Sequence, residues 1–134
     1  MSDHLTHIVE YLEDQLTGYT VGTNIFRGHM PDSPAACVTV YDAGGNTAPY
    51  GACFPWEEHM IEVRCRAASA SAALALAQSV HAKLSFVSAV EMNSALNVEF
   101  SRAEGHPARF DRDQENRIIF LARYRMGVRR TDNY

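Results

Sequence analysis

The sequence lacks any long run of apolar residues. No stretch approaches the roughly 18 apolar residues that a membrane-spanning helix needs. Residues 67–80 are mostly alanine and serine, which is typical of a helix in a soluble protein. Residues 1–4 carry neither a basic region nor an apolar segment, so we expect no secretion signal. The sequence therefore predicts neither a membrane protein nor a secreted one.

Cysteine and lysine are both scarce. The three cysteines, Cys37, Cys53 and Cys65, form no CxxC pair. An odd number of cysteines fits free thiols in a reducing cytosol and argues against a disulfide framework. Lys83 is the only lysine among twelve basic residues.

Charge is distributed unevenly along the chain. The formal net charge is −4, which disfavours nonspecific binding to nucleic acid. Residues 1–100 hold 4 basic and 11 acidic side chains, whereas residues 101–134 hold 8 arginines and 5 acids. Opposite charge on two parts of one molecule favours ordered self-association. The alternative is an ordinary solvated surface.

Catalytic and metal-binding patterns are missing as well. Cys53 and His59 could form a thiolate–imidazole pair, but no basic neighbour or third orienting group is indicated. The histidines are scattered without the HExxH spacing of a zinc site. Residues 111–115 begin like a calcium loop, but Asn116 stands where that loop needs glycine. We expect no catalytic residue, no cofactor and no metal ion.

Two segments have the periodicity of amphipathic helices. One apolar stripe opens the chain at Leu5, Ile8, Val9, Leu12 and Leu16, with Gly18 as its end. A second helix begins at Ser69 or Ser71. Its apolar positions are Leu74, Ala77, Val80, His81 and Leu84.

Other segments alternate like strands. They are residues 23–27, 36–42, 59–66, 94–102 and 117–130. Gly105 to Pro107 breaks the fourth strand, and residues 113–116 form a turn before the last strand. The pattern predicts one α+β domain over residues 1–134, in two layers. Its sheet would be mainly antiparallel with four or five strands, and both helices would pack on one face.

Two groups of residues are candidates for an interface. The segment Gly44–Trp56 is rich in glycine and proline and is expected to be neither a helix nor an inner strand. It also holds three large rings, Tyr50, Phe54 and Trp56, which are typical of docking loops. The second group consists of Arg64, Arg66, Arg123 and Arg125, on the polar faces of two strands, with Glu62 or Glu99 as partners. A solvated sheet face is the alternative explanation for the second group.

The order of these parts resembles the small tail terminator, or tail completion, proteins of tailed phages, including some called minor capsid proteins. The resemblance is carried by the amphipathic helix, Phe26-Arg27-Gly28, the strand 34–41 ending at Gly44-Gly45, Val63-Arg64-Cys65-Arg66 before the alanine-rich helix, and the last hairpin at residues 113–117. It spans nearly the whole chain.

The resemblance implies a structural virion protein rather than an enzyme. Such a protein is made in the bacterial host cytoplasm and forms a ring, commonly a hexamer, at the head-proximal end of the tail tube. Its partners would be further copies of itself, the tail tube protein and the proteins of the head–tail connector or neck, with no specific nucleic-acid or membrane partner. Three alternatives stay open: another position in the neck, a small-molecule-binding domain with a pocket under residues 50–56, and nucleic-acid binding through the arginine-rich C-terminal third.

Overall fold

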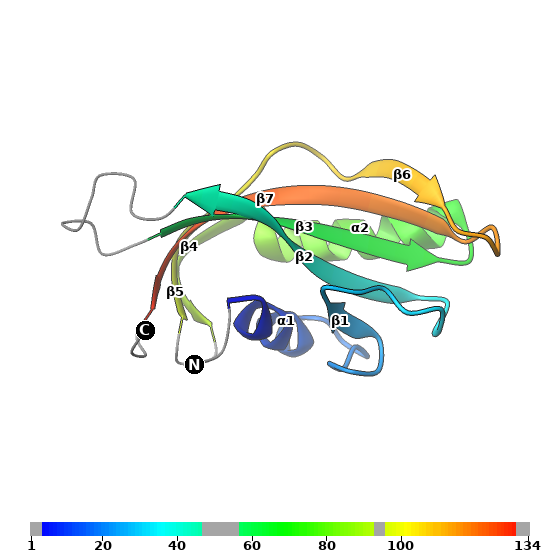
Figure 1. Cartoon of the computed structure of the whole chain (residues 1–134), viewed down its shortest axis with the longest axis horizontal. Helices are drawn as coiled ribbons and strands as arrows, with labels where there is room; N and C mark the ends of the chain where they lie inside the picture. The colour runs from blue at the N-terminus through cyan, green and yellow to red at the C-terminus, as the bar shows by residue number, and fades with distance from the viewer. Residues whose placement is uncertain (1–3, 47–56, 93–95, 131–134) are drawn as a thin grey trace.

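The computed structural model describes residues 4–46, 57–92 and 96–130. Within these residues the chain forms two helices and one seven-stranded sheet (Figure 1). The helices are α1 (His4–Gln15) and α2 (Ala70–Leu84). The strands are β1 (Ile25–Arg27), β2 (Cys37–Asn46), β3 (Glu57–Ala67), β4 (Phe86–Met92), β5 (Leu96–Ala103), β6 (Ala108–Arg112) and β7 (Ile118–Arg130).

The α+β class is confirmed, but the expected number of strands was too low. Two strands of the described residues, β4 and β6, were not predicted. All five residues of β6 are exposed, so its sequence has no alternation of buried and polar positions. Only Ser85 separates the end of α2 from the start of β4. A connection of one residue contains no glycine or proline that would have marked the start of a new strand in the sequence.

Helix α1 forms as its apolar stripe predicts. Leu5, Ile8, Val9 and Leu12 are buried, and Leu16 just beyond the helix is buried too. The amide of Leu16 still donates to the carbonyl of Leu12, at 2.8 Å. The helix then stops, and the chain turns at Gly18 with a φ of +85°, a conformation that favours glycine.

Helix α2 begins at the predicted cap but turns a slightly different face to the core. Ser69 is the N-cap, and its hydroxyl accepts the amide of Ala72 at 3.2 Å. Ala73 and Leu76 are buried together with the predicted Ala77, Val80 and Leu84, whereas Leu74 is only half-buried. The many small residues made the facing direction hard to assign from the sequence.

The sheet runs in the order β1-β2-β3-β7-β5-β4, with β6 paired to β7 beside this path. Among the described strand pairs, only β1 and β2 are parallel, so the sheet is mainly antiparallel as expected. Strands β5 and β6 pair with successive parts of β7. The chain between them contains Gly105 and Pro107, which is the predicted break.

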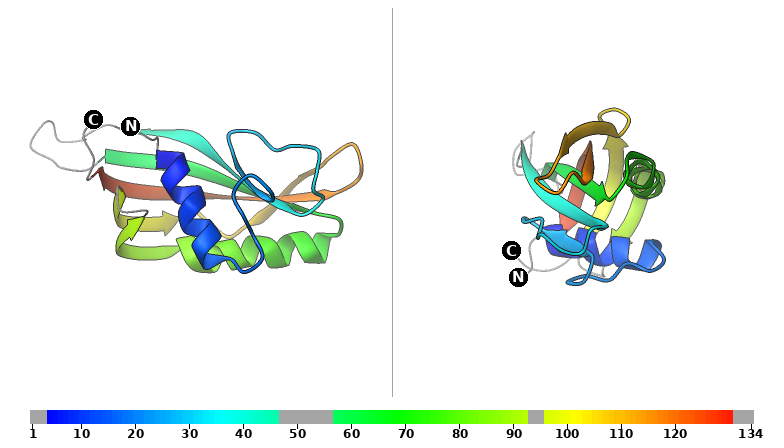
Figure 2. Two further views of the ribbon diagram at one scale, coloured as in Figure 1. Left: turned by 90° about the horizontal axis from the view of Figure 1, so that it is seen from below. Right: turned by 90° about the vertical axis from the view of Figure 1, so that its right-hand side faces the viewer.

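Both helices pack on the same face of the sheet. Most of their buried side chains form one core with the inward-facing side chains of β2, β3, β5 and β7. Ala73 of α2 packs in a small second cluster with Ala67 and Ile118. Helix α2 runs along the strands and α1 crosses them obliquely (Figure 2). Strand β6 pairs with β7 as an edge strand of the same sheet. In the described residues, neither helix is long and apolar enough to span a bilayer.

A tyrosine at the centre of the core is linked to α2. The hydroxyl of Tyr124 is fully buried and lies 3.0 Å from Nδ1 of His81. Burial raises the pKa of Tyr124, so this hydroxyl stays protonated. Burial also lowers the pKa of His81, and the nearby His106 lowers it further. Both pKa directions fit a neutral imidazole whose Nδ1 accepts a hydrogen bond from the hydroxyl of Tyr124.

The segment Gly44–Trp56 requires a correction at its start. Strand β2 continues to Asn46, past an irregularity in its pairing with β3 between Asp42 and Gly45. Gly44 has a φ of +102°, and such a residue lets the strand bend and continue. Residues 47–56, with the candidate interface rings Tyr50, Phe54 and Trp56, lie outside the described residues.

Candidate functional site: a charged outer face of the sheet

The sheet face opposite the helices carries most of the candidate residues. Alternation along β3 turns Ile61, Val63 and Cys65 to the core and the residues between them outward. The register of β3 and β7 then sets Glu62 directly opposite Arg123, and Arg64 opposite Leu121. Adjacent strands therefore bring acidic and basic side chains of distant segments together on one surface.

Glu62 is the centre of this surface. Although it is a carboxylate, only 6% of the residue is exposed. It accepts the Nε donor of Arg64 at 2.6 Å through one oxygen and the Nε donor of Arg123 at 3.1 Å through the other. Two charge-assisted hydrogen bonds offset the cost of burying the carboxylate. Of the two acidic partners considered from the sequence, Glu62 pairs as expected, whereas Glu99 pairs with Arg129 at 3.2 Å.

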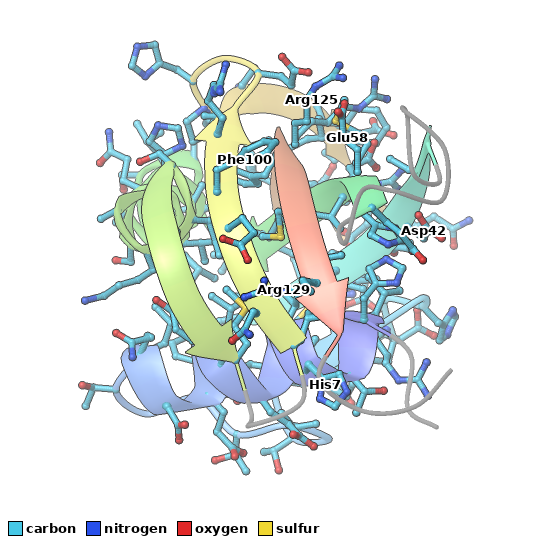
Figure 3. All side chains as sticks on the ribbon, turned by 90° about the vertical axis from the view of Figure 1, so that its left-hand side faces the viewer. His7, Asp42, Glu58, Phe100, Arg125 and Arg129 are labelled. Carbon is cyan, nitrogen blue, oxygen red and sulfur yellow. The ribbon has the colours of Figure 1, made fainter. Side chains whose placement is uncertain are left out.

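Arg125 has two acidic partners that the sequence did not reveal. One guanidinium nitrogen contacts Glu58 on the neighbouring strand, and Nε donates to Glu104 at 3.0 Å. Figure 3 shows Glu58 and Arg125 lying together on this side of the molecule. Hydrogen bonds from Arg125 to Glu58 and Glu104 raise the pKa of the guanidinium. Only acidic residues within the predicted strands were considered as partners from the sequence, whereas Glu104 follows the end of β5.

Arg66 binds residues of its own chain. Only 3% of Arg66 is exposed, and it donates to the carbonyls of Pro34 at 2.7 Å and Ala35 at 3.2 Å. Its third contact is Asp113, at 3.8 Å. These bonds fix the loop before β2 to the β6–β7 turn. Little of this side chain is left for a partner to reach, so the accessible arginines of the original group are Arg64, Arg123 and Arg125.

Arg64 is held between two aromatic rings. Its guanidinium carbon lies 4.6 Å from the ring centre of Tyr41 and 4.7 Å from that of Phe110. Burial raises the pKa of Tyr41, so the phenol is uncharged beside the guanidinium. Phe110 was not a candidate in the sequence, yet half of its surface is exposed. The available signal in the sequence was a phenylalanine placed among charged residues, in the run Arg109-Phe110-Asp111-Arg112.

A polar cavity of about 470 Å³ opens beside this stack. Arg64, Arg66, Arg112 and Arg117 line it, together with Asp32, Asp113 and Glu115. Arg117 is held by Asp113 at 2.7 Å and by the carbonyl of Asp32 at 2.6 Å. The cavity is therefore lined largely by side chains that already form ion pairs within the chain. It presents a polar surface rather than an apolar ligand pocket.

Comparison with known proteins identifies the family. A family model described as "Bacteriophage tail terminator protein" matches residues 11–129. The chain belongs to the bacteriophage tail terminator family. No curated protein sequence matches it. One solved structure, 9% identical, covers 96% of both chains with a TM-score of 0.49, which is too low to support any inference.

The thiols and imidazoles of this tail terminator family member do not converge on a reaction centre in the described residues. Burial raises the pKa of Cys65 and of Cys37, which disfavours a nucleophilic thiolate at either position. His59 stacks on His4 with ring centres 4.1 Å apart and lies 3.1 Å from Glu57. Cys53, its suggested partner, lies outside the described residues. In the described part of the chain, no group of three or more His, Cys, Asp or Glu side chains is arranged around a metal site.

Proposed function

We propose that this tail terminator family member forms a ring, commonly six-fold in such proteins, on the head-proximal end of the tail tube. There it ends tube polymerisation and joins the tail to the head connector. The protein is then a structural part of the virion, made in the cytoplasm of the bacterial host. The observation that carries this proposal is the family match over residues 11–129.

The charged outer face supports this role. The side chains of Arg123 and Arg125 are 57% and 44% exposed, although each is also bonded to a carboxylate of its own sheet. A guanidinium has five donors, so both arginines keep donors for carboxylates of another protein. Rigid arginines held by neighbouring acids lose little conformational freedom when a partner binds.

Growth of tail tubes provides the test. Purified tail tube protein is polymerised with and without the chain, and tube lengths are measured by negative-stain electron microscopy. We expect a ring at one end of each tube and no further elongation. Tubes that grow equally well with the chain would contradict the terminator role. A chain that binds connector proteins but never tube ends would place it elsewhere in the neck.

Charge reversal tests whether the outer face itself contacts the tube or whether only the net charge of the protein affects binding. The variant Arg123→Glu should bind tube ends at least tenfold more weakly, because the partner's carboxylates would be repelled. Arg27→Glu is the matched control, since Arg27 is also exposed but lies on edge strand β1, and binding should be unchanged. Equal loss in both variants would show that net charge alone matters.

A further inference from the structure

An exposed aromatic residue flanked by arginines stands on β6. In the described residues, Phe110 and Val21 are the large hydrophobic side chains that are exposed, at 50% and 38%. Phe110 lies at the irregularity in the pairing of β6 with β7, between Arg109 and Asp111. The guanidinium carbon of Arg64 packs against its ring, 4.7 Å from the ring centre. It is therefore a rigid apolar projection from the outer face.

The charges around this projection are available for a partner. In the described part of the chain, neither Arg109 nor Arg112 has an ion pair, and both residues are exposed. Asp111 accepts the backbone amide of Arg112 at 2.7 Å, so its carboxylate is partly used locally. We call Arg109, Phe110 and Arg112 the basic knob. A partner surface should offer an apolar recess with acidic residues near it.

Such a recess exists on the helix side of the same chain. A groove of about 660 Å³ lies between the end of α1 and the outer face of α2. We call it the helix groove; it is lined by Gln15, Leu16, Thr17, Tyr19, Ala72, Ala75, Leu76, Ser79, Ala82 and Lys83. The small side chains on α2 leave room for an aromatic ring.

The flank of the helix groove is acidic. Helix α1 contains Glu10, Glu13 and Asp14 and has no lysine or arginine. Asp14 is exposed and Glu13 is half-buried, with its carboxylate accepting the amide of Val21 at 2.8 Å. Both residues directly precede Gln15, the first residue that lines the groove. Arginines beside an entering phenylalanine would meet these carboxylates. The helix groove therefore offers the basic knob an apolar recess with more acidic than basic side chains around it, Lys83 being the basic residue of its lining.

We infer that the basic knob of one copy docks in the helix groove of the next copy. The two surfaces are formed by different elements, the knob by β6 and the groove by α1 and α2. In the right-hand view of Figure 2, β6 lies at the top of the molecule and α1 at the bottom, with α2 to the side. Two different surfaces that meet head to tail leave each added copy with one free surface, so the assembly continues until it closes. This inference rests on the proposed ring and names the contact that would build it.

A mixing experiment distinguishes this contact from any other. Phe110→Ser removes the knob, and Ala75→Arg blocks the groove without changing a buried residue. Each variant alone should be monomeric by light scattering at concentrations where the wild-type chain assembles. An equimolar mixture should form dimers and nothing larger, because each dimer uses the one intact knob and the one intact groove.

Gln78→Arg is the matched control, because Gln78 is exposed on the same helix but does not line the groove. It should assemble like the wild-type chain. Circular dichroism should show every variant folded. If both variants still assemble, or if their mixture stays monomeric, the inference is overturned while the ring on tail tubes can still stand. If wild-type chains never associate with each other, the inference fails whatever the tube assay shows.

Discussion

At the scale of single residues, Gly127 shows how one missing side chain shapes the outer face. The ring of Phe100, on the neighbouring strand, lies across Gly127, and an added Cβ would meet Cε1 of that ring at 2.3 Å. Figure 3 shows Phe100 beside β7. Glycine in a strand is usually unfavourable, but here it provides the space for an aromatic ring.

Gly127→Ala should therefore destabilise the protein by about 1–3 kcal/mol, because the Phe100 ring must leave its place. Urea unfolding followed by circular dichroism measures this loss. In a Phe100→Ala background, the same glycine substitution should cost almost nothing. An equal cost in both backgrounds would show that the ring is not the obstacle.

Glu62 is the second residue whose environment predicts a measurable effect. Glu62→Gln keeps the shape but removes the charge that Arg64 and Arg123 share. We expect a loss of about 1–3 kcal/mol in the free energy of unfolding. Glu115→Gln is the control: its side chain is 70% exposed and 3.7 Å from Arg117, so about 0.5 kcal/mol or less is expected. Similar losses would refute the special role of Glu62.

At the scale of elements, the β6–β7 hairpin depends on one carboxylate. Asp113 accepts the backbone amides of Arg117 at 2.9 Å and Glu115 at 3.0 Å, and the Arg117 side chain at 2.7 Å. Burial by itself would raise the pKa of Asp113, but these hydrogen bonds outweigh it and lower the pKa below its usual value. Asn116 completes the turn with a φ of +62°.

Acid should therefore weaken the hairpin. A lowered folded pKa gives stability that is present above the unfolded pKa, near 3.9, and is lost as the pH falls through the folded value. The test compares urea midpoints between about pH 5 and about pH 3, which spans the ordinary pKa of an aspartate. Over this range the midpoint of the wild-type protein should fall more steeply than that of Asp113→Asn. Parallel curves for the two proteins would contradict this assignment.

The elements also show where sequence patterns were sufficient. The apolar stripe of α1 was read correctly because Ile8 and Leu12 must face one side of any helix with that sequence. The same reasoning failed for β6, because an exposed edge strand needs no apolar alternation. What holds β6 in place is its pairing with β7, which no local pattern encodes.

At the scale of the whole molecule, one core joins both helices to the sheet. This arrangement predicts that residues 1–134 unfold as a single domain. Ile8→Ala in α1 and Leu84→Ala in α2 each remove a fully buried side chain and should cost about 2–5 kcal/mol. Far- and near-ultraviolet circular dichroism should shift together in urea. Transitions that separate in either variant would indicate two independent units.

The sequence alone determined the class of this molecule. Periodicity fixed the two helices and the inward faces of the long strands, since burial of apolar side chains follows directly from their spacing. The order of parts also indicated the tail terminator family, which the family match confirms. Tertiary structure alone decided which charges meet. Glu62 with Arg123 and Glu58 with Arg125 are over sixty residues apart, and only strand pairing brings them within hydrogen-bond distance.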